Sequence, residues 1–211
     1  MKMAVLGCGN MSKALVPAMK NNVSDLEVYT FNPTVSKAKN LAEATSGKWV
    51  SKISELPPCD IYLIACKPQQ FKSLALSLKT YIKNNAIIIS ILAGTSVSSI
   101  QEELEVSHIV RSMPNTPSLI GEGVNALYFT KNFSESSKNY IYEMFRSKMG
   151  PYEFQTEEEI DLITPYSGSG PAYLFTIVDI LSRDLQEKGV DATVAKEMVA
   201  QTMYGAAKLL L

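Results

Sequence analysis

Histidine, cysteine and tryptophan are scarce in this chain of 211 residues, which has one His, three Cys and one Trp. A metal site needs several such ligands close together, and no cluster with that spacing occurs, so we expect no metal. Cys8, Cys59 and Cys66 are odd in number and show no disulfide pattern. We therefore expect no disulfide framework, and we interpret the thiols as small, buried and inert.

The chain also lacks a charge excess and long apolar runs. Its formal net charge is -1 and it has no basic run, so it carries no electrostatic footprint for nucleic acid or an anionic membrane. No apolar run reaches membrane-spanning length, and too few apolar residues follow Lys2 for a signal-peptide core. With 46% hydrophobic residues, we expect a globular cytoplasmic protein that binds a small molecule.

The first twelve residues combine an apolar run with a glycine turn. Met3-Ala4-Val5-Leu6 reads as a strand and is followed by Gly7-Cys8-Gly9-Asn10-Met11-Ser12. Glycines allow a sharp turn close to a ligand, and the amides at a helix N-terminus suit a pyrophosphate. This is the front half of a dinucleotide-binding fingerprint, with Ser12 in place of the usual third Gly or Ala. Taken alone, it fits an ordinary glycine turn before a helix equally well.

Strand and helix patterns then alternate along most of the chain. We expect strands at 26–31, 49–50, 61–65, 86–90, 108–111, 125–129 and 151–154, and helices at 10–22, 34–45, 70–81, 97–104 and 135–148. Parallel strands need crossover connections of this kind. The pattern therefore predicts an α/β fold with a doubly wound, mainly parallel sheet of the Rossmann type.

Near Thr164 the alternation of strands and helices ends, and two helices are predicted at 172–188 and 192–211. We therefore divide the chain into a nucleotide-binding Rossmann domain, residues 1–163, and an all-helical domain, residues 164–211. The first of these helices is apolar around most of its circumference and needs a partner. The helical pattern extends to Leu211 without a capping residue. We therefore expect either a truncated chain or terminal leucines that are buried against another chain.

The residues after the second predicted strand bear on cofactor choice. An Asp or Glu there holds the ribose 2′-hydroxyl of NAD, whereas a 2′-phosphate repels one. This position is Phe31-Asn32, without an acid, which favours NADP over NAD. The side chains that can surround a phosphate are Asn32, Thr34, Ser36, Lys37 and Lys39. The alternative is that Lys37 and Lys39 only solvate a helix face.

Five motifs occur together, in order and at fitting distances: residues 7–11 (GCGNM), 65–69 (ACKPQ), 93–100 (AGTSVSSI), 111–117 (RSMPNTP) and 167–173 (SGSGPAY). By these motifs the chain resembles the pyrroline-5-carboxylate reductases over its whole length. The resemblance implies an oxidoreductase that passes a hydride from NADPH, or less often NADH, to the C=N bond of 1-pyrroline-5-carboxylate. The product is proline, and the reaction is the last step of proline biosynthesis.

The resemblance also implies cofactor-binding residues. These would be Leu6, Gly7, Cys8, Gly9, Asn10 and Met11 at the pyrophosphate, Asn32 at the adenosine phosphate, Ala65, Cys66, Lys67, Pro68, Leu92 and Ala93 along the dinucleotide, and Asn115 near the nicotinamide. It further implies that the helical domain intertwines with that of a second copy in a homodimer, which often assembles into a larger homo-oligomer.

No side chain is assigned a catalytic role, because the hydride comes from the cofactor and the protein has to orient it against the imine carbon. We find no paired carboxylates and no nucleophile with an adjacent base. His108, the only histidine, opens a predicted strand, and we interpret it as a residue without a catalytic role.

The chain departs from the family at its end. The family continues past the position of Leu211 into a loop reading roughly Ser-Pro-Gly-Gly-Thr-Thr and further helices, which are implicated in substrate binding. We therefore expect the 211 residues to be weakly active or inactive. One alternative is a non-catalytic or regulatory NADP-binding relative. Another is a reductase for a different cyclic imine or a β-hydroxyacid.

Overall fold

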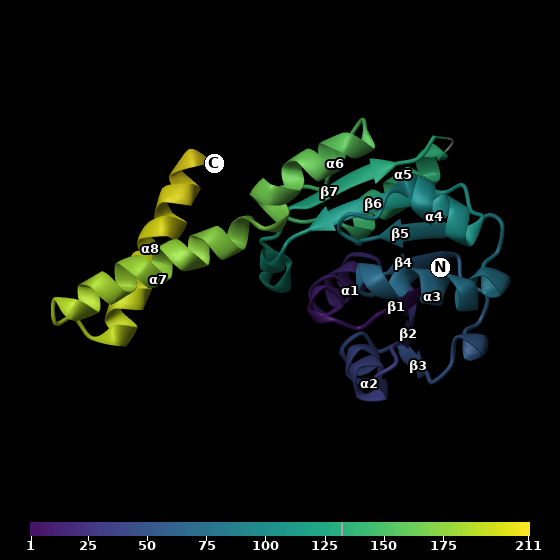
Figure 1. The fold of residues 1–211 in the computed structure, drawn as a ribbon, viewed down its shortest axis with the longest axis horizontal. Coiled ribbons are helices and arrows are strands. Elements are labelled where there is room, and N and C mark those ends of the chain that lie inside the picture. Colours follow the sequence, from purple (N-terminus) through teal and green to yellow (C-terminus); the bar gives the residue numbers. More distant parts are fainter. Residues whose placement is uncertain (132) are drawn as a thin grey trace. The chain divides into compact units, whose positions relative to one another are not determined.

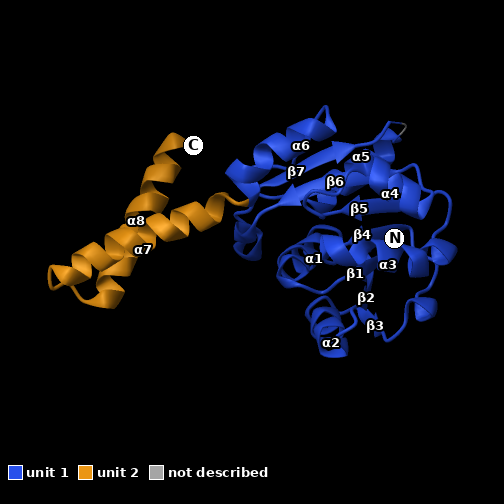
Figure 2. Ribbon diagram, viewed as in Figure 1, with its two compact units in different colours: residues 1–168 blue, residues 169–211 orange. Residues whose placement is uncertain are grey.

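The computed structural model describes residues 1–131 and 133–211. These residues form two compact units, residues 1–168 and residues 169–211 (Figure 2). The domain boundary predicted from the sequence, at Thr164, falls on the first residue of a π-helical turn, η4 (Thr164–Gly168). This turn is the last element of the first unit. Each unit is described below by itself.

The first unit is built on a sheet of eight described strands in the order β3-β2-β1-β4-β5-β6-β7-β8 (Figure 1). Described neighbours run parallel, except for the antiparallel pair β6 and β7. The strands are β1 (Lys2–Leu6), β2 (Glu27–Phe31), β3 (Lys48–Val50), β4 (Ile61–Ile64), β5 (Ile87–Ser90), β6 (Ile109–Pro114), β7 (Asn125–Phe129) and β8 (Tyr152–Phe154).

Helices and short helical turns connect these strands. They are α1 (Asn10–Asn22), α2 (Val35–Ala44), η1 (Ile53–Glu55), α3 (Pro68–Leu78), η2 (Lys79–Tyr81), α4 (Val97–Leu104), η3 (Thr116–Ile120), α5 (Glu135–Met144) and α6 (Glu157–Ile163). Several predicted bounds differ from those of the structure, and two of the differences have a clear structural reason. The helix predicted at 135–148 ends at Met144, and the chain turns back where the Ser147 N–H donates to the Gly150 carbonyl (2.9 Å). The strand predicted at 108–111 continues to Pro114, because its last residues pair with β7.

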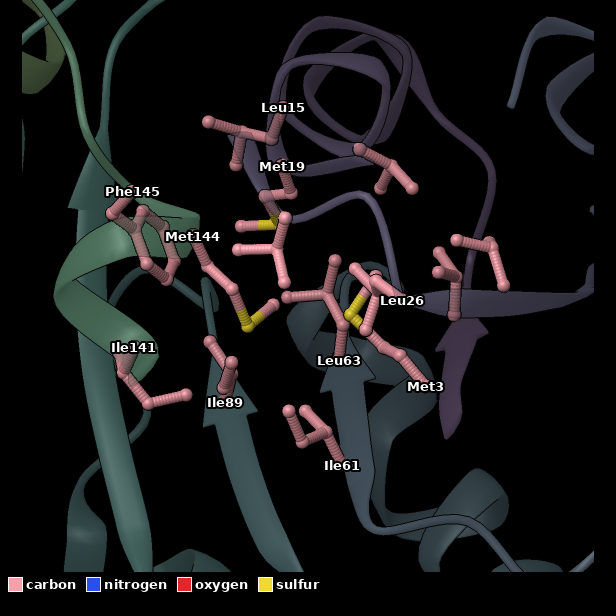
Figure 3. Close-up of a cluster of buried hydrophobic side chains, with 14 of the residues drawn as sticks. Met3, Leu15, Met19, Leu26, Ile61, Leu63, Ile89, Ile141, Met144 and Phe145 are labelled. Atoms are coloured by element: carbon pink, nitrogen blue, oxygen red, sulfur yellow. The ribbon is translucent and has the colours of Figure 1, made fainter. Parts of the chain in front are cut away.

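Both faces of the sheet are covered, and each face has its own apolar cluster. Met3, Val5 and Leu63 belong to the cluster on the side of α1, α2 and α5, which Figure 3 shows in part. Ala4 and Leu6 alternate with them and belong to the cluster on the side of α3 and α4. Because successive strand residues point to opposite faces, a strand buried on both sides must be apolar throughout. This explains the continuous apolar sequence of β4.

α6 was not predicted from the sequence. Only Ile160 is buried in it, so the apolar periodicity that marks a helix is weak. It begins with a capping box, in which the Thr156 hydroxyl accepts the Glu159 N–H (3.4 Å) and the Glu159 carboxylate accepts the Thr156 N–H (2.9 Å). Ion pairs from the buried Arg111 of β6 to Glu157 and Asp161 fasten the helix to the sheet.

The second unit is a helical hairpin of α7 (Gly170–Glu187) and α8 (Ala192–Leu210). Gly189, with φ +92°, follows the first helix, and the Asp191 carboxylate caps the second by accepting the N–H groups of Thr193 (2.9 Å) and Val194 (3.1 Å). Many of its large apolar side chains are exposed by about half or more. On α7 they are Tyr173, Leu174, Phe175, Ile177, Ile180 and Leu181.

In the described residues, no helix combines the length and the apolar character that crossing a membrane requires. Exposed large apolar side chains like those of the hairpin are typical of an interaction surface.

Candidate dinucleotide-binding cleft

The sheet changes its winding direction between β1 and β4. The chain passes from β1 outward to β2 and β3 and then returns to the other side of β1 with β4. In open α/β sheets, ligands bind beyond the carboxyl ends of the strands at such a switch point. A cavity of about 630 Å3 lies there. It is lined by Leu6, Gly7, Gly9, Phe31, Asn32, Pro33, Thr34, Lys37, Ile53, Ala65, Cys66, Lys67, Gln69, Gln70, Ser73, Leu74 and Ser77.

Gly7 brings the end of β1 against the end of β4. Its φ is +109°, and a Cβ atom added to it would lie 2.5 Å from the carbonyl oxygen of Ala65. Its own N–H donates to the Phe31 carbonyl (3.0 Å), and its carbonyl accepts the Ser12 hydroxyl (2.5 Å). Any side chain would therefore be both strained and overlapping. Ser12 completes the fingerprint as a buried residue that ties the helix to the turn.

Gly9 provides the open side of the same turn. It is the N-cap residue of α1, no side chain caps this helix end, and an added Cβ would meet nothing within 4 Å. The first N–H groups of a helix have no partner within it and carry partial positive charge. The first turn of α1 contains no acidic residue. The space beside Gly9 and these donors fit the pyrophosphate of a dinucleotide.

Asn32 joins the loops that follow β1 and β2. Its Oδ1 accepts the Cys8 N–H (3.0 Å), and its Nδ2 donates to the Thr34 carbonyl (3.2 Å). An aspartate here would keep the acceptor but add a charge and lose the donor. The side-chain amide of Asn32 therefore holds the glycine turn in place. This role differs from the phosphate contact that was predicted from the sequence.

The charge of the cleft is positive. Among the described residues that line it, none is Asp or Glu, whereas Lys37 and Lys67 are both present. Lys39 lies elsewhere, with its Nζ 4.6 Å from the centre of the Trp49 ring. Of the two lysines that the sequence places near a 2′-phosphate, Lys37 is the one that reaches the cleft. An exposed lysine in the first turn of α2, the helix that follows β2, fits a phosphate better than a ribose hydroxyl.

The two cysteines at the cleft differ in position. The Cys8 side chain is fully buried in the core, so only its backbone faces the glycine turn, and burial raises the pKa of its thiol to about 12. Cys66 lines the cleft, and burial raises the pKa of its thiol to about 11. A raised pKa keeps a thiol protonated at neutral pH, so neither is an activated nucleophile.

Within the part of the chain that the structure describes, no group of three His, Cys, Asp or Glu side chains lies in a position to hold a metal ion. His108 precedes the first residue of β6, at the amino edge of the sheet, and its ring packs edge-to-face on Phe133 with centroids 5.5 Å apart. It is therefore remote from the strand ends that form the cleft.

Comparisons with known proteins agree with this geometry. A family model described as pyrroline-5-carboxylate reductase dimerisation matches residues 157–211, and one described as NADP oxidoreductase, coenzyme F420-dependent, matches residues 2–94. Pyrroline-5-carboxylate reductase 1 of Bacillus spizizenii is 31% identical over 217 residues, which cover all of this chain and 72% of the relative. The chain belongs to the pyrroline-5-carboxylate reductase family.

Solved structures of the family share the fold. Plasmodium falciparum pyrroline carboxylate reductase with NADP bound is 29% identical, with a TM-score of 0.86, and the match covers all of this chain and 78% of that one. A pyrroline-5-carboxylate reductase from Coxiella burnetii is 27% identical, also with a TM-score of 0.86, and the match covers 98% of this chain and 78% of the other. The predicted fold class, a Rossmann-type sheet followed by a helical domain, is confirmed.

The cleft gathers half of the predicted cofactor residues of this family member. Those that line it are Leu6, Gly7, Gly9, Asn32, Ala65, Cys66 and Lys67. Those outside its lining are Cys8, Asn10, Met11, Pro68, Leu92, Ala93 and Asn115. Asn10 and Met11 form the first turn of α1, and Pro68 begins α3. Leu92 and Ala93 follow β5 and Asn115 follows β6, farther along the same carboxyl edge.

Asn115 is held by its own side chain. Its Oδ1 accepts the Val124 N–H (2.9 Å), and its Nδ2 donates to the Ser167 carbonyl of η4 (3.3 Å). The residue is buried, with 6% of its surface exposed. Its amide therefore fixes the loop after β6 instead of pointing freely at a ligand, and the role near the nicotinamide that the resemblance implies stays a prediction.

The wall of the cleft that α3 supplies was not predicted from the sequence. Gln70, Ser73, Leu74 and Ser77 line the cavity, together with Ile53 of η1. The four α3 residues are spaced three or four positions apart, which places them on one side of the helix. This spacing can be read from the sequence. Which side of α3 faces the ligand depends on how the helix packs on the sheet, so the spacing alone did not identify the wall.

Two glycine variants separate the roles of the turn. We expect Gly7→Ala to lower the free energy of unfolding by at least about 2 kcal/mol, because the methyl group meets the backbone at Ala65 and the φ angle is unfavourable. We expect Gly9→Ala to fold normally but to bind NADPH about tenfold more weakly, because its methyl group fills the phosphate space. Urea unfolding and fluorescence titration measure the two effects, and equal behaviour of both variants would contradict this division of roles.

Proposed function

We propose that this chain catalyses the reduction of the C=N bond of 1-pyrroline-5-carboxylate to proline with NADPH as the hydride donor. The observation that carries the proposal is similarity over the whole chain to pyrroline-5-carboxylate reductases, at about 30% identity, with the fold of an NADP-bound relative. The positively charged cleft at the switch point supports it. NADH is the second cofactor that the cleft can hold.

Different residues of the cleft would hold different parts of the cofactor. The turn at Gly7 and Gly9 and the first amides of α1 would hold the pyrophosphate. Lys37 and the polar groups after β2 would hold the adenosine phosphate, and the apolar side chains of Ile53 and Leu74 would flank the adenine. The residues after β5 and β6, farther along the same carboxyl edge, would then hold the nicotinamide.

The protein contributes orientation more than acid–base chemistry. When bound, NADPH would supply a hydride to the imine carbon of the substrate, and the substrate's imine nitrogen would keep or take up one proton. The chain must hold the dinucleotide in an extended form and keep the walls of the nicotinamide site, formed in this proposal by Leu92, Ala93 and Asn115, at a constant separation. Accordingly, we assign no catalytic side chain.

The direct test is the reaction itself. Purified protein supplied with NADPH and 1-pyrroline-5-carboxylate should consume one NADPH for each proline formed, at the low rate expected of these 211 residues. NADPH absorbance and chromatography of the product measure the two quantities. Omission of the imine should stop NADPH oxidation. Tight NADPH binding without any proline would contradict catalysis by these 211 residues, and a lack of binding of either nicotinamide cofactor would contradict the cofactor assignment as well.

Lys37 should discriminate NADPH from NADH. We expect Lys37→Ala to raise the Kd for NADPH about tenfold, or about 1.4 kcal/mol, because a charge-assisted contact to the 2′-phosphate is lost. The Kd for NADH should change by less than about twofold, since NADH lacks that phosphate. Lys39→Ala is the matched control, because Lys39 lies over Trp49 and outside the cleft. Calorimetric titration that gives the same change for both cofactors would overturn this role.

We also propose that the chain forms a homodimer through its helical hairpin. The match of residues 157–211 to the dimerisation family and the exposed apolar side chains of α7 support a second copy as the occupant of this surface. Light scattering should give at least twice the 23.2 kDa of one chain. Phe175→Glu should yield monomer, whereas Lys188→Glu, at the end of the hairpin, should not. A monomeric parent protein would contradict the proposal.

We place the protein in the cytoplasm, where thiols are kept reduced. Cys8, Cys59 and Cys66 are all free in the structure. Unpaired cysteines are typical of proteins in a reducing compartment. Fractionation of cells that produce the protein tests this location.

A further inference from the structure

A buried guanidinium group lies in the part of the sheet formed by β5 to β8. Arg111 of β6 has 1% of its side chain exposed. Its Nη1 donates to Glu157 Oε1 (2.8 Å), and its Nη2 donates to Asp161 Oδ1 (2.6 Å). A buried charge of this kind needs its partners, because the desolvated cation is costly when left alone.

Glu157 makes a second contact that Asp161 does not make. The same Oε1 atom accepts the N–H of Val97, the first residue of α4, at 2.7 Å. One oxygen atom therefore connects β6, the start of α4 and the start of α6. Glu157 is also the less exposed partner, with 21% of its side chain accessible against 60% for Asp161, so solvent screens its interaction less.

These contacts lie between two loops at the carboxyl edge. Residues 91–96 run from β5 to α4, so the Glu157 contact to Val97 fixes the end of that loop. Residues 115–117 follow β6, the strand that carries Arg111. Segment 157–168 is also tied to the loop after β6, where Asn115 Nδ2 donates to the Ser167 carbonyl (3.3 Å). The two loops are thus held at a set separation through one chain segment.

We propose that Glu157 is a positioning residue that fixes the separation of these two loops, and through them the nicotinamide ring. The proposal rests on the proposed function, in which Leu92, Ala93 and Asn115 lie beside that ring. Hydride transfer needs its two carbon atoms in close contact, and a displacement of about 1 Å can cost about a hundredfold in rate. The adenosine half binds at β2 and α3, so its affinity should depend little on Glu157.

Three variants test this role. Glu157→Ala removes both contacts, whereas Glu157→Gln keeps an oxygen that can accept the Val97 N–H. Glu158→Gln is the matched control, since Glu158 is its exposed neighbour on the same helical turn. Hydrogen exchange of the cofactor-free protein should be about tenfold faster at Val97 in Glu157→Ala, partly restored in Glu157→Gln and unchanged in Glu158→Gln, because only the first removes this acceptor.

The cofactor-bound protein gives a second, independent signal. In Glu157→Ala the fluorescence anisotropy of the bound nicotinamide should fall and kcat should drop about tenfold, while the Kd for NADPH stays within about threefold of the parent value. Equal behaviour of Glu157→Ala and Glu158→Gln would overturn the proposal. So would faster exchange in all strands, which indicates a merely structural role. Failure of the parent protein to bind NADPH would overturn the proposed function. The hydrogen-exchange result needs no cofactor, so it would still test whether Glu157 holds the start of α4.

Discussion

The close approach of two strand ends, β1 and β4, is the constraint on which the cleft depends. Gly7 leaves no room for a Cβ atom against the backbone at Ala65, and its left-handed φ angle suits glycine alone. The approach leaves the next glycine, Gly9, facing open space at the start of α1. The same turn thus packs the sheet on one side and presents unpaired amides on the other. Structural stability and anion binding are linked in this turn because neighbouring residues serve both.

The electrostatics of the cleft follow from which side chains the sheet brings to its carboxyl edge. The end of β2 supplies an amide, Asn32, instead of a carboxylate, and the amide is occupied by hydrogen bonds to Cys8 and Thr34. Positive charge comes from Lys37 and Lys67. A site with these properties attracts a phosphate, and none of the described residues that line it is Asp, Glu or His. This is consistent with a reaction in which the protein mainly holds two reactants in place.

The part of the sheet formed by β5 to β8 contains a buried charge in addition to its apolar clusters. Arg111 lies in β6, where a short apolar run predicted only half of the strand. Its carboxylate partners belong to α6, a helix that apolar periodicity could not identify because Ile160 is its only buried residue. Sequence reasoning is weakest at such places, since ion pairs join residues far apart in the chain and leave no local period. The loops that this network holds include the one that contains Asn115.

The sequence by itself determined the alternation of strands and helices, the glycine turn, the missing acid after β2 and, through its five motifs, the family. These properties are local, because backbone freedom, apolar period and residue type act over a few neighbouring positions. Only the tertiary structure decided that Lys37 and not Lys39 reaches the cleft, that α3 supplies a wall, and that Asn115 and Glu157 hold loops. Those outcomes depend on which residues distant in the chain come into contact, and that is set by how helices pack on a twisted sheet.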